Sequence, residues 1–202
     1  KEKLDISLSA LRSEVRFIVC RWNGSFKKKY RFLGDAFERA YGNLEWRGLN
    51  PHRIMPWYFV ASDNNESLGF GVKVRPNAFC FWMCDSQGIS LWLDVRCGAM
   101  GVILGGRQLE LATVITDWAD NMSAFLFLKK FCKKMCNDPL LPDNPVYGSN
   151  NWYYAYGDSS AGQILKDTEI VARASKGLKN RPYMVIDDCW QELALINVGG
   201  AA

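Results

Sequence analysis

The feature that most constrains the fold is an alternation of apolar and polar residues with a period of two. It runs from Leu4 to about Thr116, and groups of Gly, Pro, Asn and Asp interrupt it. Successive side chains of a β-strand point to opposite faces, so this pattern is typical of strands with one buried face. We therefore predict an antiparallel β-sandwich over residues 1–118. The clearest alternating runs are Ile6 and Leu8; Val15, Phe17 and Val19; Phe70, Val72 and Val74; and Leu91, Leu93 and Val95.

A helical pattern follows the alternating region, from Asp120 to Cys136. Phe125, Leu128, Cys132 and Met135 share one face of this segment, and lysines lie opposite. The spacing predicts an amphipathic helix, which we expect to pack on the edge of the sandwich. Three prolines then block regular structure up to residue 145. Residues 119–144 are thus predicted to form a linking helix and a Pro-rich domain linker.

The residues after this linker predict a strand, a helix and a second strand. A short strand is expected at 146–148. Ser160 and Gln163 have the spacing at which a hydroxyl and an amide cap the first N–H groups of a helix reciprocally. Lys176 and Gly177 suit its end. The run 183–186 is continuously apolar, as in parallel strands covered on both faces. Together these elements have the size of one βαβ unit.

Side chains suited to ligand binding follow both of these predicted strands. Asn150, Asn151 and Trp152 come after the first strand, and Asp187 and Asp188 come after the second. Ligands of parallel α/β folds bind at the carboxyl ends of strands, so we expect these residues to face one site. Three alternatives remain open: the aspartates only cap the next segment, Trp152 is a packing residue, and Trp190 belongs to a core instead of a pocket.

Composition restricts the class of protein. The chain has 202 residues, of which 49% are hydrophobic, and this is enough for a globular core. Its net charge of +4 is modest, and its lysine clusters do not interleave with aromatic residues, so no nucleic acid is expected as a partner. No apolar run approaches the ~18 residues of a spanning helix, so no membrane partner is expected. Composition is compatible with a cytoplasmic, a periplasmic or a secreted protein.

The cysteines and the single histidine limit the available chemistry. Seven cysteines cannot all pair within the chain, and no Cys-x-x-Cys pair occurs. We therefore predict buried free thiols, and expect neither a zinc site nor another cofactor. A Ser-His-Asp or Cys-His arrangement would need His52, which lies in a Pro-rich turn. Carboxylates are the better candidates for acid–base chemistry.

Two motifs after the linker carry a resemblance to a known family. Residues 145–157 place a glycine and Trp152 after the first predicted strand, and residues 185–191 read Val-Ile-Asp-Asp-Cys-Trp-Gln after the second. Together they resemble the opening of the catalytic barrel in the α-galactosidase (melibiase) families of glycoside hydrolases. Segments 32–35, 42–47 and 91–97 resemble the β-supersandwich that precedes this barrel in the larger, microbial type.

The resemblance implies a fold and a set of roles. It implies that residues 145–202 begin a (β/α)8 TIM barrel and that the protein acts on terminal α-linked galactose or a related sugar. Asp187 and Asp188 would bind sugar hydroxyls, Trp152 would line the same subsite, and Trp190 is a further candidate. Carboxylates suit this role because they only accept hydrogen bonds. Two departures are Ser149, where the family often has tryptophan, and Cys189, where many microbial relatives have glycine.

The catalytic residues are not expected within this sequence. In the resembled family the nucleophile and the acid/base come from later strands. A barrel needs ~250 residues, far more than follow Pro145. We therefore expect an N-terminal part of a retaining hydrolase, inactive by itself. The alternatives are a non-catalytic carbohydrate-binding β-sandwich protein and a module that docks on other chains; a homo-oligomer is compatible with each. Asp35 and Trp46 could reach a substrate across the domain interface or from a neighbouring subunit.

Overall fold

The computed structural model describes residues 3–9, 12–37 and 44–190. The chain forms two compact units, Lys1–Pro139 and Leu140–Ala202. Residues 42 and 43 of the segment 42–47, Gln191 and the tail 193–202 lie outside the described residues. Among the described helices, none combines the length and the apolar character needed to cross a bilayer.

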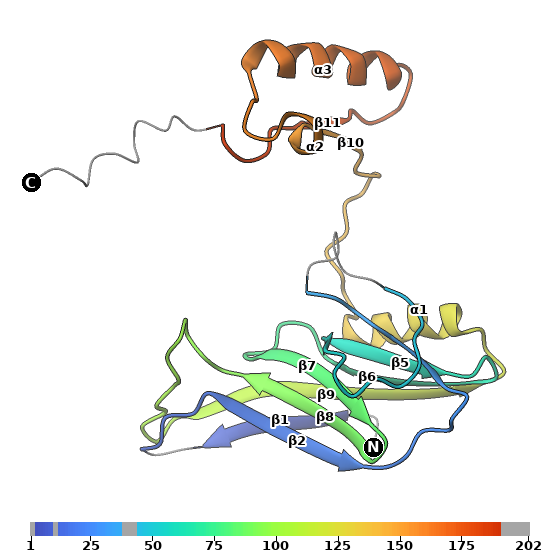
Figure 1. Cartoon of the computed structure of the whole chain (residues 1–202), viewed down its shortest axis with the longest axis vertical. Helices are drawn as coiled ribbons and strands as arrows, with labels where there is room; N and C mark the ends of the chain where they lie inside the picture. The colour runs from blue at the N-terminus through green and yellow to red at the C-terminus, as the bar shows by residue number, and fades with distance from the viewer. Residues whose placement is uncertain (1–2, 10–11, 38–43, 191–202) are drawn as a thin grey trace, which may run out of the picture. The chain divides into compact units, whose positions relative to one another are not determined.

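The first unit consists of two antiparallel sheets packed face to face, with one helix on the outside (Figure 1). The strand order is β1-β9-β6-β5-β3 in the larger sheet and β2-β8-β7-β4 in the smaller. This confirms the predicted antiparallel sandwich. The strands are β1 (Lys3–Ser9), β2 (Phe17–Asn23), β3 (Arg31–Gly34), β4 (Met55–Pro56), β5 (Tyr58–Ser62), β6 (Glu66–Val72), β7 (Phe79–Asp85), β8 (Gly88–Asp94) and β9 (Gln108–Asp120), and the helix is α1 (Ala124–Met135).

An aromatic core joins the two sheets, and Trp82 of β7 lies at its centre. This side chain is completely buried. Its ring centroid lies 6.0 Å from that of Trp22 in the same sheet, and 5.8 and 6.2 Å from those of Phe59 and Phe70 in the opposite sheet. These are favourable aromatic distances. The indole N–H donates to the carbonyl of Trp57 at 3.2 Å, so the polar atom of this buried ring is also satisfied.

Strand β2 has the predicted period but presents the other face to the core. Phe17 and Val19, expected to point inward, are 41% and 46% exposed. Ile18, Cys20 and Trp22 pack against the core instead. Both faces of this strand are apolar, so the alternation alone could not select the buried one.

Helix α1 packs on the outer face of the five-stranded sheet, not on the edge that we predicted (Figure 1). Gly69 and Gly71 of β6 provide the space: a Cβ at position 69 would lie 2.9 Å from Cδ2 of Phe131, and one at position 71 would collide with Met135. The predicted helix face was also wrong in part. Phe127, Phe131 and Met135 are buried, whereas Phe125 and Cys132 are exposed.

Salt bridges hold α1 in this position. Lys134 Nζ lies 2.8 Å from one oxygen of Asp117 on β9, and Lys130 Nζ lies 3.4 Å from the other. The Asp117 side chain is only 6% exposed. Burial raises its pKa, but Lys134, the backbone N–H of Trp118 and Lys130 outweigh this, so the pKa lies below its ordinary value. The charged side of α1 is thereby tied to the sheet.

Glu66 connects several segments at the start of β6. Its carboxylate accepts hydrogen bonds from Lys27, from the hydroxyl of Tyr30 and, at 2.9 Å, from the indole N–H of Trp118. The bond from Lys27, followed by those from Tyr30 and Trp118, lowers the pKa of Glu66 to about 2. The ionised form therefore stabilises the junction of these segments.

The cysteines differ in burial, so the prediction of buried free thiols holds for only some of them. No disulfide joins the seven cysteines, and Cys80 and Cys84 of β7 are buried as predicted. Burial raises the pKa of Cys80 to about 12. Cys97, Cys132 and Cys189 are exposed, so the prediction was wrong for them.

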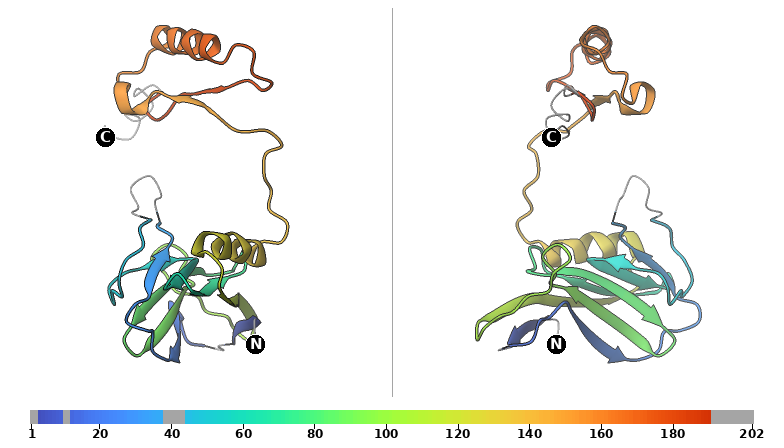
Figure 2. Two further views of the ribbon diagram at one scale, coloured as in Figure 1. Left: turned by 90° about the vertical axis from the view of Figure 1, so that its right-hand side faces the viewer. Right: turned by 60° about the vertical axis from the view of Figure 1, so that its left-hand side comes forward.

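The second unit is a small βαβ arrangement (Figure 2). It contains β10 (Gly148–Asn150), the short α2 (Trp152–Ala155), α3 (Ala161–Ala174) and β11 (Tyr183–Val185), and β10 pairs with β11 in parallel. Ser160 caps α3 by accepting from the N–H of Gln163 at 3.3 Å. The reciprocal half of the predicted cap is absent, because the Gln163 side chain donates to Asp167. Gly177 follows the helix at φ 88°, as expected of a glycine at this end.

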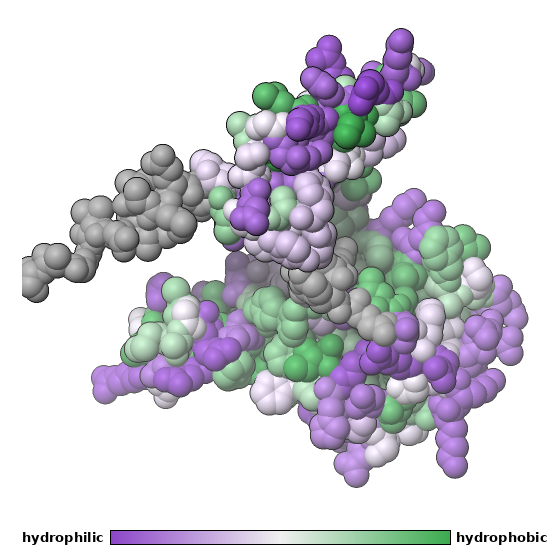
Figure 3. All heavy atoms as spheres, turned by 45° about the horizontal axis from the view of Figure 1, so that its top comes forward, coloured by the Kyte–Doolittle hydropathy of each residue, from purple (hydrophilic) through white to green (hydrophobic). Residues whose placement is uncertain are grey.

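The parallel strands of this unit are covered on one face only. Tyr183, Val185 and Ile186 are all about half exposed or more, so the prediction of a strand buried on both faces was wrong. Apolar side chains of α3, including Leu165 and Ile170, are also exposed between charged ones (Figure 3).

The contact between Gly69 and Phe131 yields a first prediction. Gly69→Ala should lower the free energy of unfolding by about 1–3 kcal/mol, because the added methyl group meets a rigid ring in a filled site. Urea unfolding followed by tryptophan fluorescence measures this change. Gly24→Ala is the matched control, since a Cβ at Gly24 meets no atom within 4 Å. Equal stability of the two variants would contradict the assigned packing.

The environment of Glu66 yields a second prediction. Its folded-state pKa lies below its ordinary value of 4.5, so its contribution to stability is present above pH 4.5 and is lost as the pH falls towards about 2. Glu66→Gln should therefore be less stable than the wild type at pH 7, and the difference should shrink across this window. Urea unfolding at several pH values tests this. Glu110→Gln, whose carboxylate forms no ion pair among the described residues, should show no such convergence.

Candidate functional site

The parallel pair brings the two predicted motifs to one edge of the second unit. Gly148 pairs with Tyr183, and Asn150 pairs with Val185. The chain leaves both strands in the same direction, so residues 150–152 and 186–188 follow adjacent strand ends. This arrangement is the one at which parallel α/β folds bind ligands.

Asn150 links the two motifs. Its side-chain oxygen accepts from the backbone N–H of Trp152 at 2.7 Å, and its side-chain nitrogen donates to Oδ2 of Asp187 at 2.7 Å. One amide thus holds the start of the Trp152 segment against the carboxylate after β11. The sequence pattern placed Asn150 in the cluster after the first strand but contained no signal for this bridging contact.

The two aspartates have different surroundings. Asp187 is half-buried, and its second oxygen, Oδ1, accepts from the N–H of Asp188 at 2.8 Å, so both of its oxygens have protein partners. Asp188 is exposed, and its Oδ1 accepts from the N–H of Cys189 at 2.7 Å. Among the described residues, none donates to Oδ2 of Asp188. Both residues lie beyond the end of β11, as predicted, and Asp188 lies in a bend.

The tryptophans are more accessible than core residues. Trp152 is half-buried and contacts Tyr156 edge to face, with ring centroids 5.6 Å apart. Trp190 is 72% exposed, which is incompatible with a core position in the described structure. Tyr153, Tyr154 and Tyr156 are also exposed. The aromatic cluster therefore supplies surface rings beside the strand ends.

Asn151 differs from its neighbours because it is buried, with only 1% of its surface exposed. Its side-chain oxygen accepts from the backbone N–H of Asp187 at 2.9 Å, and its nitrogen donates to the hydroxyl of Ser159 at 2.8 Å. The cluster was predicted to face a ligand site, and for the buried Asn151 this was wrong. No pattern in the sequence separates the buried amide from the exposed Asn150.

Residues Asp35 and Trp46 lie in the first unit. Asp35 is buried, accepts from the N–H of Ala36 at 2.9 Å and lines a cavity of about 580 Å³ together with Trp57, Tyr58 and Met135. Trp46 is half-buried beside the residues under α1. Their expected contact with a substrate, across the domain interface or from a neighbouring subunit, stays a prediction.

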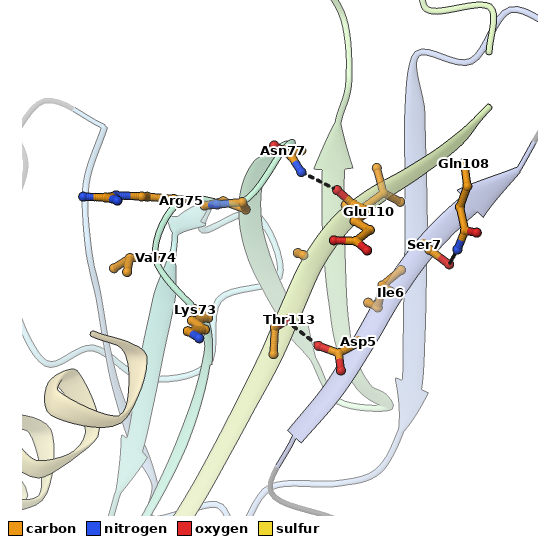
Figure 4. Close-up of a pocket in the computed structure, with 13 residues that line it drawn as sticks. Asp5, Ile6, Ser7, Lys73, Val74, Arg75, Asn77, Gln108, Glu110 and Thr113 are labelled. Carbon is orange, nitrogen blue, oxygen red and sulfur yellow. Dashed lines mark hydrogen bonds between the residues drawn. The ribbon is translucent and has the colours of Figure 1, made fainter. Parts of the chain in front are cut away.

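A polar groove of about 490 Å³ lies on the sandwich between β1, β9 and residues 73–77 (Figure 4). Its polar groups are largely bonded to one another: Thr113 donates to Asp5 at 2.5 Å, Gln108 to Ser7 at 3.0 Å, and Asn77 to the carbonyl of Glu110 at 2.8 Å. The groove contains none of the predicted site residues. These hydrogen bonds hold β1 and residues 73–77 against β9, and they do not indicate a ligand.

Within the described residues, no group of three or more His, Cys, Asp and Glu side chains is placed to hold a metal ion. The acid groups at the strand ends are instead arranged as hydrogen-bond acceptors. No protein-family model matches this sequence, and no curated protein matches it significantly.

Proposed function

We propose that the second unit carries the sugar-recognition part of a glycoside hydrolase site that takes terminal α-linked galactose or a related sugar. In this proposal the second unit is the first βαβ unit of a (β/α)8 barrel, and the sandwich is the β-supersandwich of the larger, microbial α-galactosidase type. The observation that carries the proposal is the bond between Asn150 and Asp187, because it joins the two motifs of the resemblance at adjacent strand ends.

The chemistry of the strand ends supports a polyhydroxylated ligand. Asp188 has an exposed carboxylate oxygen without a partner among the described residues, and a sugar hydroxyl can donate to it. Such charge-assisted hydrogen bonds are stronger than those between neutral groups. The nearby rings of Trp152 and Trp190 supply partly exposed apolar surfaces against the C–H groups of a sugar.

The doublet is proposed to bind and not to catalyse. Retaining hydrolysis needs two carboxyl groups about 5–5.5 Å apart on opposite sides of the scissile bond. Both oxygens of Asp187 are engaged by Asn150 and by the Asp188 N–H, which suits a fixed acceptor and not a nucleophile. In the resembled family the catalytic carboxylates come from later strands, so the proposal assigns them to sequence outside these 202 residues.

A second candidate is glycan binding by the sandwich without catalysis. The outer face of the four-stranded sheet carries contacting aromatic rings: Phe81 and Trp92 are nearly parallel with centroids 5.8 Å apart, and Phe17 contacts Trp92 edge to face. Phe17 and Phe79 are 41% and 43% exposed on this face. Exposed rings of this kind can stack on sugars, and this observation favours the alternative.

Residue-resolved NMR titration of the whole chain with methyl α-D-galactopyranoside tests the proposal. Shifts should concentrate at residues 150–152 and 187–190, and the glucose epimer should cause smaller ones. Asp188→Asn should weaken binding about tenfold or more, because it removes a charge from the acceptor. Asp143→Asn, an exposed substitution before β10, is the matched control and should leave the affinity within about twofold of the wild type.

Several results would count against the proposal. An absence of galactoside binding, or an unchanged affinity in Asp188→Asn, would overturn it. Shifts confined to Phe17, Phe79 and Trp92 would favour the second candidate. Release of nitrophenol from a nitrophenyl α-galactoside by the 202-residue chain would contradict the assignment of the catalytic carboxylates to other sequence.

A further inference from the structure

We infer that Asn151 is a positioning residue that sets the direction of the Asp187-Asp188 doublet towards the ligand. This inference rests on the proposed function of the second unit. Asn151 does not itself face the ligand, since it is 99% buried. It acts through Asp187, because its side-chain oxygen accepts a hydrogen bond from the backbone N–H of Asp187 at 2.9 Å.

The strands that lead to the doublet are short. β10 and β11 have three residues each, so the ladder between them ends at Asn150 and Val185. Asp187 lies two residues beyond the last pair. Without a further contact, the chain after Val185 could leave the sheet in several directions.

Asn151 supplies this contact and extends the pairing beyond the strands. Its oxygen accepts from the N–H of Asp187, beyond the last residue pair of the ladder, and this bond fixes the backbone of Asp187. Its nitrogen is fixed in turn by the hydroxyl of Ser159, in the segment before α3. A buried amide with both ends satisfied is held in one orientation.

The effect reaches both carboxylates. The backbone of Asp187 is held by Asn151, while the Asp187 side chain is held by Asn150. Asp187 Oδ1 then accepts from the N–H of Asp188, so the orientation of one aspartate influences the next. The two asparagines therefore act on different parts of one acceptor pair.

Asn151→Ala in the full chain tests this role. It should weaken methyl α-D-galactopyranoside binding about tenfold or more and should accelerate hydrogen exchange at the Asp187 N–H. The matched control is Tyr147→Phe, which removes the hydroxyl that donates to the carbonyl of Asn180 before the amino ends of the same strands. The control should lower the melting temperature of the unit but keep the affinity within about twofold of the wild type.

The outcomes separate this inference from the proposed function. If the wild type fails to bind the galactoside, the proposed function fails. A comparison of the hydrogen-exchange rate at the Asp187 N–H between the wild type and Asn151→Ala then still tests whether Asn151 holds that residue. If the wild type binds and Asn151→Ala binds equally well, the positioning role is overturned. It is also overturned if Tyr147→Phe weakens binding as much as Asn151→Ala. If Asn151→Ala does not fold, Ser159→Ala provides the milder variant, which releases only one end of the amide and should weaken binding in the same direction.

Discussion

The burial of Trp82 between the two sheets is the interaction on which the sandwich depends. Its ring contacts Trp22 in its own sheet and Phe59 and Phe70 in the opposite sheet. A side chain of this size fills the space between the layers, and its single polar atom finds a backbone carbonyl. Replacement by a smaller residue would leave a cavity between the layers, so the distance between the sheets is set at this position.

The outer layer of the first unit depends on the opposite property, the absence of side chains. Gly69 and Gly71 face α1, whereas Leu68 and Phe70 of the same strand face the core. Strand β6 therefore has small residues on the face that contacts α1 and large residues on the face that contacts the core. The buried Asp117 then ties the lysines of α1 to β9. The helix could be predicted from the sequence but its partner could not, because Gly-x-Gly in a strand indicates only a weak strand until the ring that occupies the space is known.

The second unit relies on amides instead of a large core. Its strands are short and its apolar residues are widely exposed, so Asn150 and Asn151 carry much of the order at the strand ends. The motif residues could be selected from the sequence because aspartates and aromatic residues after strands are unusual and suit sugars. The different roles of two adjacent asparagines could not be selected, since burial is a property of the surrounding chain and not of residue type.

The sequence by itself determined the β-sandwich, the place of α1 along the chain, the βαβ order and the residues that follow its strands, because period, capping and turn residues are local signals. The tertiary structure decided which face of β2 is buried, which face of α1 contacts the sheet and which asparagine is buried. Both faces of β2 and two overlapping faces of α1 are apolar, so local patterns allow either choice. Only the partner surface, with Trp82 on one side and the glycines of β6 on the other, fixes the outcome.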